Sequence, residues 1–263
     1  MVEQLKLANI DEKFLAERLE ESRQVIQEVV GKSEKPLIIQ FSGGKDSMAM
    51  VGLVREVTDN FICSYMKTGI EFPEAITFAK DTARKLNFDL LISTPEDHLG
   101  SFFERLPNFG WPTIHSTWCN RDLKVRPQKK RLVKEYGKGN YYKIVGVRRY
   151  ESTRRRKMHS AGNFFANDYQ VGGDTLVYPL LNWTSDDVKN YLKASGLPTS
   201  GLYKDYGVSG CYWCPFYQAS IYLRILKDYP NLYDQFIEWE EKLGPSVNGH
   251  KYLRDLKKEA GYS

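Results

Sequence analysis

Long apolar runs are absent from this chain of 263 residues, and cysteine is scarce, with four residues. No stretch approaches the roughly 18 apolar residues of a membrane-spanning helix. The opening sequence, MVEQLKLANIDEKF, lacks the apolar core of a secretory signal. Both absences predict a cytoplasmic protein that does not associate with a membrane. Four cysteines are too few for a disulfide scaffold, so we expect thiols or metal ligands.

The composition is that of an ordinary folded protein, with 41% hydrophobic and 27% charged residues. The length suits one large domain or a domain with a modest appendage. A net charge of +5 is a weak indication of an anionic partner.

Short apolar segments alternate with amphipathic ones along most of the chain. Strands are predicted at 36–41, 61–66, 88–93, 141–147 and 175–181. Helices are predicted from the cap residue Asp11 to Gly31, over the basic segment 120–136, and after the capping pair Thr184 and Asp187. This alternation predicts an α/β fold with a Rossmann-like parallel sheet and helices on both faces.

A candidate phosphate loop, Ser42-Gly43-Gly44-Lys45-Asp46-Ser47, lies between the first strand and a helix. The glycines permit close backbone approach, and a helix N-terminus favours an anion. Lys45 supplies a countercharge, Ser42 and Ser47 supply hydroxyl donors, and Asp46 suits a bridging magnesium ion. The segment does not match a Walker A loop. The alternative interpretation is a glycine-rich turn with a capping serine.

The phosphate loop resembles that of the ATP pyrophosphatase superfamily. Three later segments resemble its phosphoadenosine-phosphosulfate (PAPS) reductase branch, in the same order and over residues 36–216: TGIEFPE at 68–74, GVRRYES at 146–152 and YPLLNWT at 178–184. The resemblance implies an adenine nucleotide alpha-hydrolase-like fold that binds ATP and Mg²⁺. It also implies a nucleotide-binding domain at 1–215, which includes an N-terminal helix, and a helical C-terminal extension at 216–263.

The resemblance assigns roles to individual residues of the nucleotide cleft. Thr68 and Gly69 would lie near the ribose and base, and Gly146, Arg148 and Glu151 would line the same cleft. The catalytic candidates are Lys45, Asp46 and Arg148.

Three of the four cysteines form a candidate metal centre. Cys211 and Cys214 have the two-residue spacing that lets two thiolates bind one centre, and Cys119 lies in a basic segment. The alternatives are a zinc site, with His115 as a conceivable further ligand, or a pair of free thiols. Cys63, inside an apolar strand, is expected in the core. By resemblance to relatives that thiolate tRNA, the three cysteines would hold a 4Fe-4S cluster with one open iron.

A basic run at 148–157 carries six positive charges in ten residues. A solvated face is one interpretation. The other is a phosphate clamp, in which Arg148 and Arg149 serve ATP and residues 154–157 bind a longer polyanion. The basic segment 120–131 would border the same groove.

Two further features separate the branches of the superfamily. Reductases of the PAPS branch carry a nucleophilic cysteine in the C-terminal tail, whereas no cysteine follows Cys214 here, and the phosphate loop is complete. We therefore expect an ATP pyrophosphatase that adenylates a nucleic acid for sulfur transfer, as in tRNA thiolation or DNA phosphorothioation, with a donor such as a cysteine desulfurase. The alternatives are a PAPS or APS (adenosine phosphosulfate) reductase and a non-catalytic binding module. A homodimer is compatible with the sequence.

Overall fold

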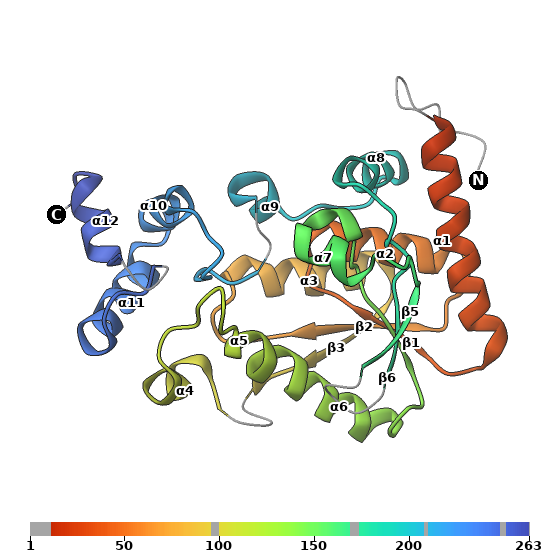
Figure 1. The fold of residues 1–263 in the computed structure, drawn as a ribbon, viewed down its shortest axis with the longest axis horizontal. Coiled ribbons are helices and arrows are strands. Elements are labelled where there is room, and N and C mark those ends of the chain that lie inside the picture. Colours follow the sequence, from red (N-terminus) through yellow and green to blue (C-terminus); the bar gives the residue numbers. More distant parts are fainter. Residues whose placement is uncertain (1–11, 96–99, 169–173, 208–209, 248–250, 263) are drawn as a thin grey trace.

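The computed structural model describes residues 12–95, 100–168, 174–207, 210–247 and 251–262. Its centre is a six-stranded sheet in the order β3-β2-β1-β4-β6-β5 (Figure 1). The strands are β1 (Leu37–Gln40), β2 (Phe61–Met66), β3 (Asp89–Ser93), β4 (Tyr142–Ile144), β5 (Phe165–Asp168) and β6 (Asp174–Val177). Five of them pair in parallel, which confirms the predicted Rossmann-like fold. The sixth strand, β5, was not predicted from the sequence, and it runs antiparallel to β6 at the edge of the sheet.

The two faces of the sheet are covered by different helices, as Figure 1 shows. One face carries α2 (Lys45–Arg55), α3 (Pro73–Leu86) and α7 (Thr153–Met158), with α1 (Glu12–Lys32) and α8 (Ser185–Ser195) beside them, and the other carries α6 (Arg126–Tyr136). The side chains of β1 alternate accordingly: Ile39 packs into the core under α2, and Ile38 packs with Leu132 of α6.

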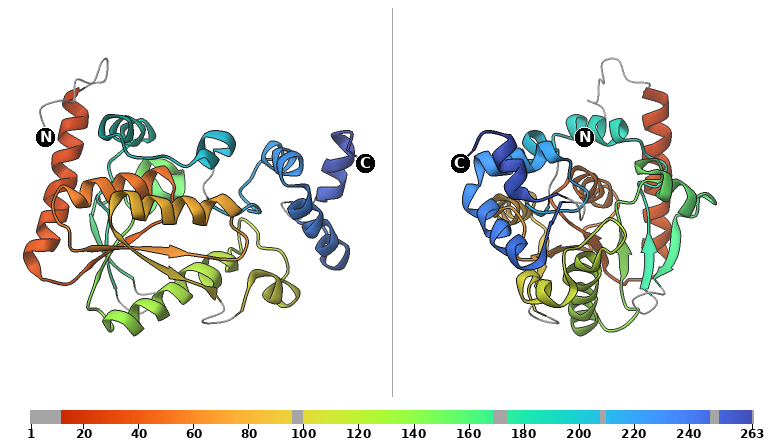
Figure 2. Two further views of the ribbon diagram at one scale, coloured as in Figure 1. Left: turned by 180° about the vertical axis from the view of Figure 1, so that it is seen from behind. Right: turned by 60° about the vertical axis from the view of Figure 1, so that its left-hand side comes forward.

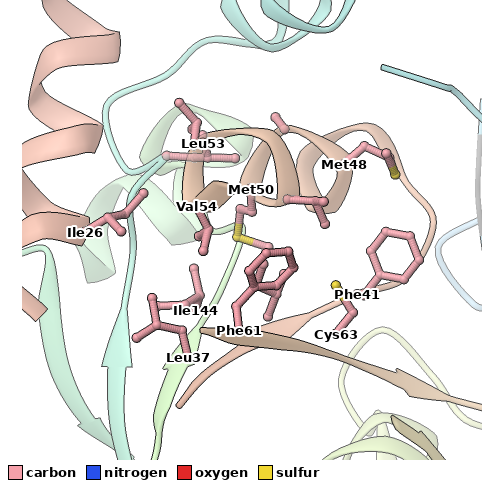
Figure 3. Close-up of a cluster of buried hydrophobic side chains, with 14 of the residues drawn as sticks. Ile26, Leu37, Phe41, Met48, Met50, Leu53, Val54, Phe61, Cys63 and Ile144 are labelled. Carbon is pink, nitrogen blue, oxygen red and sulfur yellow. The ribbon is translucent and has the colours of Figure 1, made fainter. Parts of the chain in front are cut away.

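The main core lies between α2 and the sheet (Figure 3). Met48, Met50 and Val54 of α2 are almost fully buried in it, and so is Cys63 of β2. Burial raises the pKa of the Cys63 thiol, as expected for a core residue. This packing fixes the start of α2 directly beyond the end of β1.

The predicted basic helix is built from three consecutive pieces. These are α5 (Trp118–Asn120), a π-helical turn η2 (Arg121–Val125) and α6. A π turn shifts the side chains that follow it relative to a regular α-helix, and such turns often occur at functional sites.

A second core joins the C-terminal helices to the edge of the sheet domain. It contains Phe72, Phe102 of α4 (Phe102–Phe109), Trp118, Trp213 and Phe236. The C-terminal helices are α10 (Ala219–Asp228), α11 (Pro230–Leu243) and α12 (Leu253–Glu259), and α9 (Gly201–Tyr206) precedes them. Figure 2 shows them at the end of the molecule away from α1.

Two predicted helix starts can be compared with the structure. Thr184 and Asp187 form the capping box of α8, with each side chain accepting from the other residue's backbone N–H. The predicted cap Asp11 lies outside the described residues. Within the described ranges, no helix combines the length and apolar character needed to cross a bilayer.

Candidate functional site

The phosphate loop leads from β1 into α2, as predicted. Gly43 has a φ of +73°, and a Cβ atom there would lie 3.2 Å from the ring of Phe78. The two serine hydroxyls brace the loop: Ser42 Oγ accepts from the Gly44 N–H (3.3 Å), and Ser47 Oγ donates to the Gly44 carbonyl (2.9 Å). The loop is thus held open at the N-terminus of a helix of 11 residues, a favourable place for an anion.

Three charged side chains meet at the mouth of this loop. Lys45 Nζ lies 2.7 and 2.8 Å from the Asp46 carboxylate oxygens, and Arg148 Nε donates to Asp46 Oδ1 at 2.7 Å. Burial lowers the pKa of Lys45, and its hydrogen bond to Asp46 acts in the opposite direction. The structure therefore brings together the three residues predicted to be catalytic, with one net positive charge.

The end of β4 approaches these charges closely. A Cβ atom on Gly146 would lie 3.2 Å from Met50 Cε and 3.3 Å from Asp46 Cβ, so glycine permits the approach of the β4 end to α2. Glu151 is near enough to raise the pKa of Lys45, although its carboxylate is paired with Arg155 at 3.0 Å. Both residues thus lie beside the phosphate loop.

The turn after β2 is organised by Glu71. Its Oε2 accepts from Thr68 Oγ1 and from the Gly69 N–H, both at 2.8 Å. Gly69 has a φ of +86°, a conformation that favours glycine. Thr68 is buried and Gly69 is exposed, so of these two predicted ligand residues Gly69 is the accessible one.

The same turn is paired with the segment that carries Cys211. The Phe72 N–H donates to the Gly210 carbonyl (3.2 Å), and the Tyr212 N–H donates to the Ile70 carbonyl (2.8 Å). Thr68 Oγ1 lies 3.9 Å from Cys211 Sγ. Two segments far apart in the sequence therefore form one antiparallel bridge between the nucleotide side and the cysteine side.

Cys119, Cys211 and Cys214, here called the cysteine triad, gather around Lys124. The Lys124 ammonium is near enough to interact electrostatically with all three thiols, most strongly with Cys211, and this raises the pKa of Lys124. Burial, reinforced by the neighbouring Cys211, raises the pKa of Cys119 to about 11. Burial likewise raises the pKa of Cys214. Lys124 lowers the pKa of both thiols, but burial outweighs it, so both are harder to ionise than a free cysteine.

The triad supplies three soft thiol donors, the kind of ligand that suits iron–sulfur clusters and zinc. Within the part of the chain that the structure describes, no three His, Cys, Asp or Glu side chains stand close enough to share one metal ion, and His115 is exposed. The ligands of an iron–sulfur cluster bind separate irons and so lie farther apart than those of one zinc ion. The three thiols come from two segments of the chain, at 119 and at 211–214.

An ion network behind the triad was not expected from the sequence. Asp122, in η2, is fully buried and contacts Arg105 (2.8 Å), Arg121 (2.8 Å) and Arg126 (3.0 Å). Hydrogen bonding from Arg121 lowers the pKa of Asp122. The network fixes the π turn between Cys119 and Lys124. One acidic residue in an otherwise basic segment is also typical of a solvated face, so the sequence pattern did not indicate this network.

A cavity of about 220 Å³ connects the two halves of the site. Ser42 and Tyr65 line it on the nucleotide side, and Lys124, Gln128 and Cys211 line it toward the triad. Nothing in the sequence pattern indicated Gln128.

The basic run forms an exposed surface beside this site. Its helix α7 is capped by Ser152 Oγ, which accepts from the Arg155 N–H (3.2 Å), and Arg154, Arg156 and Lys157 are exposed. Figure 1 shows α7 and α6, which carry much of the two basic segments, on opposite faces of the sheet.

The model of the phosphoadenosine phosphosulfate reductase domain matches residues 36–216, which include the phosphate loop, Arg148 and all three cysteines of the triad. The chain belongs to this family. The match confirms the family predicted from the sequence motifs, and characterised members of this family are enzymes.

The chain is similar to an uncharacterised protein of Methanocaldococcus jannaschii, with 32% identity over 207 residues. The aligned region covers 78% of this chain and 47% of that protein. The adenosine 5'-phosphosulfate reductase of Halalkalibacterium halodurans is 26% identical over 212 residues, 78% of this chain and 85% of that protein. The chain spans about half the length of the first curated relatives it matches.

Among solved structures, the U34-tRNA thiolase NcsA from Methanococcus maripaludis, with its 4Fe-4S cluster, has a TM-score of 0.58 at 17% identity. The similarity covers 96% of this chain and 82% of NcsA. At this identity the similarity shows a shared fold.

Proposed function

We propose that this protein is an ATP pyrophosphatase that adenylates an oxygen of a nucleic acid so that sulfur can replace it. The observation that carries this proposal is the cavity shared by the phosphate loop and the cysteine triad, with Ser42 on one side and Cys211 and Lys124 on the other. Activation by ATP and delivery of sulfur would then occur within one site.

The charges at the phosphate loop support binding and cleavage of ATP. Phosphate oxygens would replace the Asp46 carboxylate as the partner of Lys45 and Arg148, which frees Asp46 to bind Mg²⁺. The substrate oxygen attacks the α-phosphorus, and the bond from that phosphorus to pyrophosphate breaks. Lys45 and the N-terminus of α2 stabilise the negative charge on the leaving group.

The triad supports a sulfur step after adenylation. A sulfur nucleophile attacks the atom that bears the activated oxygen, the bond to that oxygen breaks, and AMP leaves with the oxygen. When bound to the triad, an iron–sulfur cluster would supply an iron that binds sulfur. Lys124 offsets the negative charge of the thiolates. A cysteine desulfurase is a suitable source of the sulfur.

The exposed face of α7 supports a polyanionic acceptor. Arg154, Arg156 and Lys157 point to solvent rather than to buried carboxylates. Tyr150, beside them, has the guanidinium groups of Arg149 and Arg156 at 5.2 and 5.8 Å from its ring centre. Arginine and an exposed aromatic ring are a combination that binds phosphates and stacks on bases. A tRNA or DNA strand therefore suits this surface.

Pyrophosphate release from ATP tests the proposal, measured with and without tRNA or DNA. We expect release by the parent protein and none by Lys45→Met, while the exposed Lys80→Met, the matched control, retains it. Sulfite release from APS, with no pyrophosphate from ATP, would establish the reductase alternative, which the 26% identical APS reductase favours. Neither product would indicate a non-catalytic binding module.

The metal content tests the cluster. We expect anaerobically purified protein to contain about four irons and four sulfides per chain. Cys119→Ser should lose most of this iron, whereas Cys63→Ala, in the distant core, should retain it. Stoichiometric zinc without iron would contradict the cluster.

A further inference from the structure

A row of polar side chains lies in the cavity on the α6 face of the sheet, where apolar residues would be expected. Gln40 follows Ile38 by two residues and shares its face, and it stands in register with Ser64 of β2. Gln128 lies one turn before Leu132 on α6. Gln40, Ser64 and Gln128 all line the cavity.

The orientation of the Gln128 amide is fixed by its partners. Its Nε2 donates to Ser64 Oγ at 2.9 Å and to the Ser64 carbonyl at 3.4 Å. A carbonyl oxygen can only accept, so the amide cannot be turned round. Within the described chain its Oε1 has no hydrogen-bond partner, and this side chain is 5% exposed. It presents a fixed acceptor to the cavity.

Gln40 carries a buried donor beside the cavity. Its Nε2 is buried and makes no hydrogen bond. A buried, unsatisfied amide costs about 1–3 kcal/mol, so a ligand that accepts from it recovers this loss. The cavity, at about 220 Å³, is smaller than the roughly 300–1,000 Å³ of sites for drug-sized ligands, and it suits a single base.

We infer that Gln40 and Gln128 read the edge of the adenine base of the bound nucleotide. This rests on the proposed function insofar as ATP is the nucleotide. Gln128 Oε1 accepts from the 6-amino group, and Gln40 Nε2 donates to a ring nitrogen beside it. Guanine and hypoxanthine place a carbonyl oxygen where adenine has the amino group, so two acceptors would face each other at Gln128. The pair therefore selects adenine nucleotides.

Nucleotide analogues test this reading on the unaltered protein. Calorimetric titration would compare ATP, purine riboside triphosphate, which lacks only the 6-amino group, and inosine triphosphate. We expect purine riboside triphosphate to bind about 5- to 100-fold more weakly than ATP, and inosine triphosphate at least as weakly. Equal binding of ATP and purine riboside triphosphate would overturn the inference while leaving the proposed function intact. Binding of none of the three would overturn both.

Variants then assign the contacts. Gln128→Met should bind ATP and purine riboside triphosphate equally, because the acceptor for the amino group is gone. Gln40→Met should weaken both nucleotides by a similar factor and keep their ratio, because its partner is a ring nitrogen present in each. Gln24→Met, on the exposed side of α1, is the matched control and should behave as the parent. Parent-like selectivity in Gln128→Met would overturn the assignment, and Gln40→Met and the analogue series remain decisive if Gln128→Met does not fold.

Discussion

Replacing the buried carboxylate of Asp122 by an amide should destabilise the protein strongly. The pair with Arg105 is almost completely buried, with side-chain exposures of 10% and 0%, and breaking such a pair typically costs 3–5 kcal/mol. Arg121 and Arg126 are about half exposed, so their pairs with Asp122 add less than about 1 kcal/mol each. We expect Asp122→Asn, which retains the shape of the side chain, to lower the free energy of unfolding by about 3 kcal/mol, or roughly 6–12 °C in Tm.

Equilibrium unfolding in urea measures this loss against a matched control. Asp81→Asn removes a carboxylate of an exposed pair with Arg84 and should change the stability by less than about 0.5 kcal/mol. The pKa of Asp122 is lowered in the folded state, so its stabilising effect is complete above the unfolded pKa of about 4 and disappears as the pH falls through the lower folded value. The difference between parent and variant should shrink in acid. A variant as stable as the parent at neutral pH would refute the reasoning.

Three further perturbations probe the site and its surface. Lys124→Met removes a cation that lowers the pKa of Cys119. In metal-free protein at mildly alkaline pH, mass spectrometry should therefore show slower alkylation of the Cys119 thiol than in the control Lys134→Met. An equal rate in the two variants would contradict the interaction between Lys124 and Cys119. Gly146→Ala places a methyl group 3.3 Å from Asp46 Cβ and should reduce kcat/KM for ATP at least tenfold at a stability cost of about 1–3 kcal/mol, whereas Gly31→Ala, in open space, should do neither. The charges of the exposed α7 side chains can be reversed together, as Arg154→Glu, Arg156→Glu and Lys157→Glu. This variant should bind nucleic acid more weakly, and the slope of log affinity against log salt concentration should fall by roughly 0.7–0.9 for each lost phosphate contact. ATP cleavage without nucleic acid should be retained, and a parent-like slope would exclude this surface.

The phosphate loop and the parallel strands were predictable because their signals are local. An apolar strand followed by Ser42-Gly-Gly-Lys-Asp-Ser47 needs no distant partner to be recognised. In contrast, β5 was missed because Phe165–Asp168 has no β-branched residue, and its pairing with β6 is what makes it a strand.

The rest of the site depends on contacts between distant segments. Asp122 is surrounded by basic residues in the sequence, a pattern typical of a solvated face, and its burial arises from packing with Arg105 of α4. The π turn leaves no distinct hydrophobic period in the sequence. Gln40 likewise ends an apolar strand as an ordinary polar residue would, and only the neighbouring strand and α6 show that its amide is enclosed.

The bridge between the turn after β2 and the Cys211 segment also constrains the order in which the molecule can be assembled. Thr68 and Cys211 are 143 positions apart, and closing a loop of that length costs about 4 kcal/mol of chain entropy beyond a constant term. On a ribosome, Cys119 emerges long before Cys211 and Cys214 have been synthesised. The three thiols can therefore come together only once the chain has been synthesised as far as Cys214, so any metal centre at this position is completed late in synthesis.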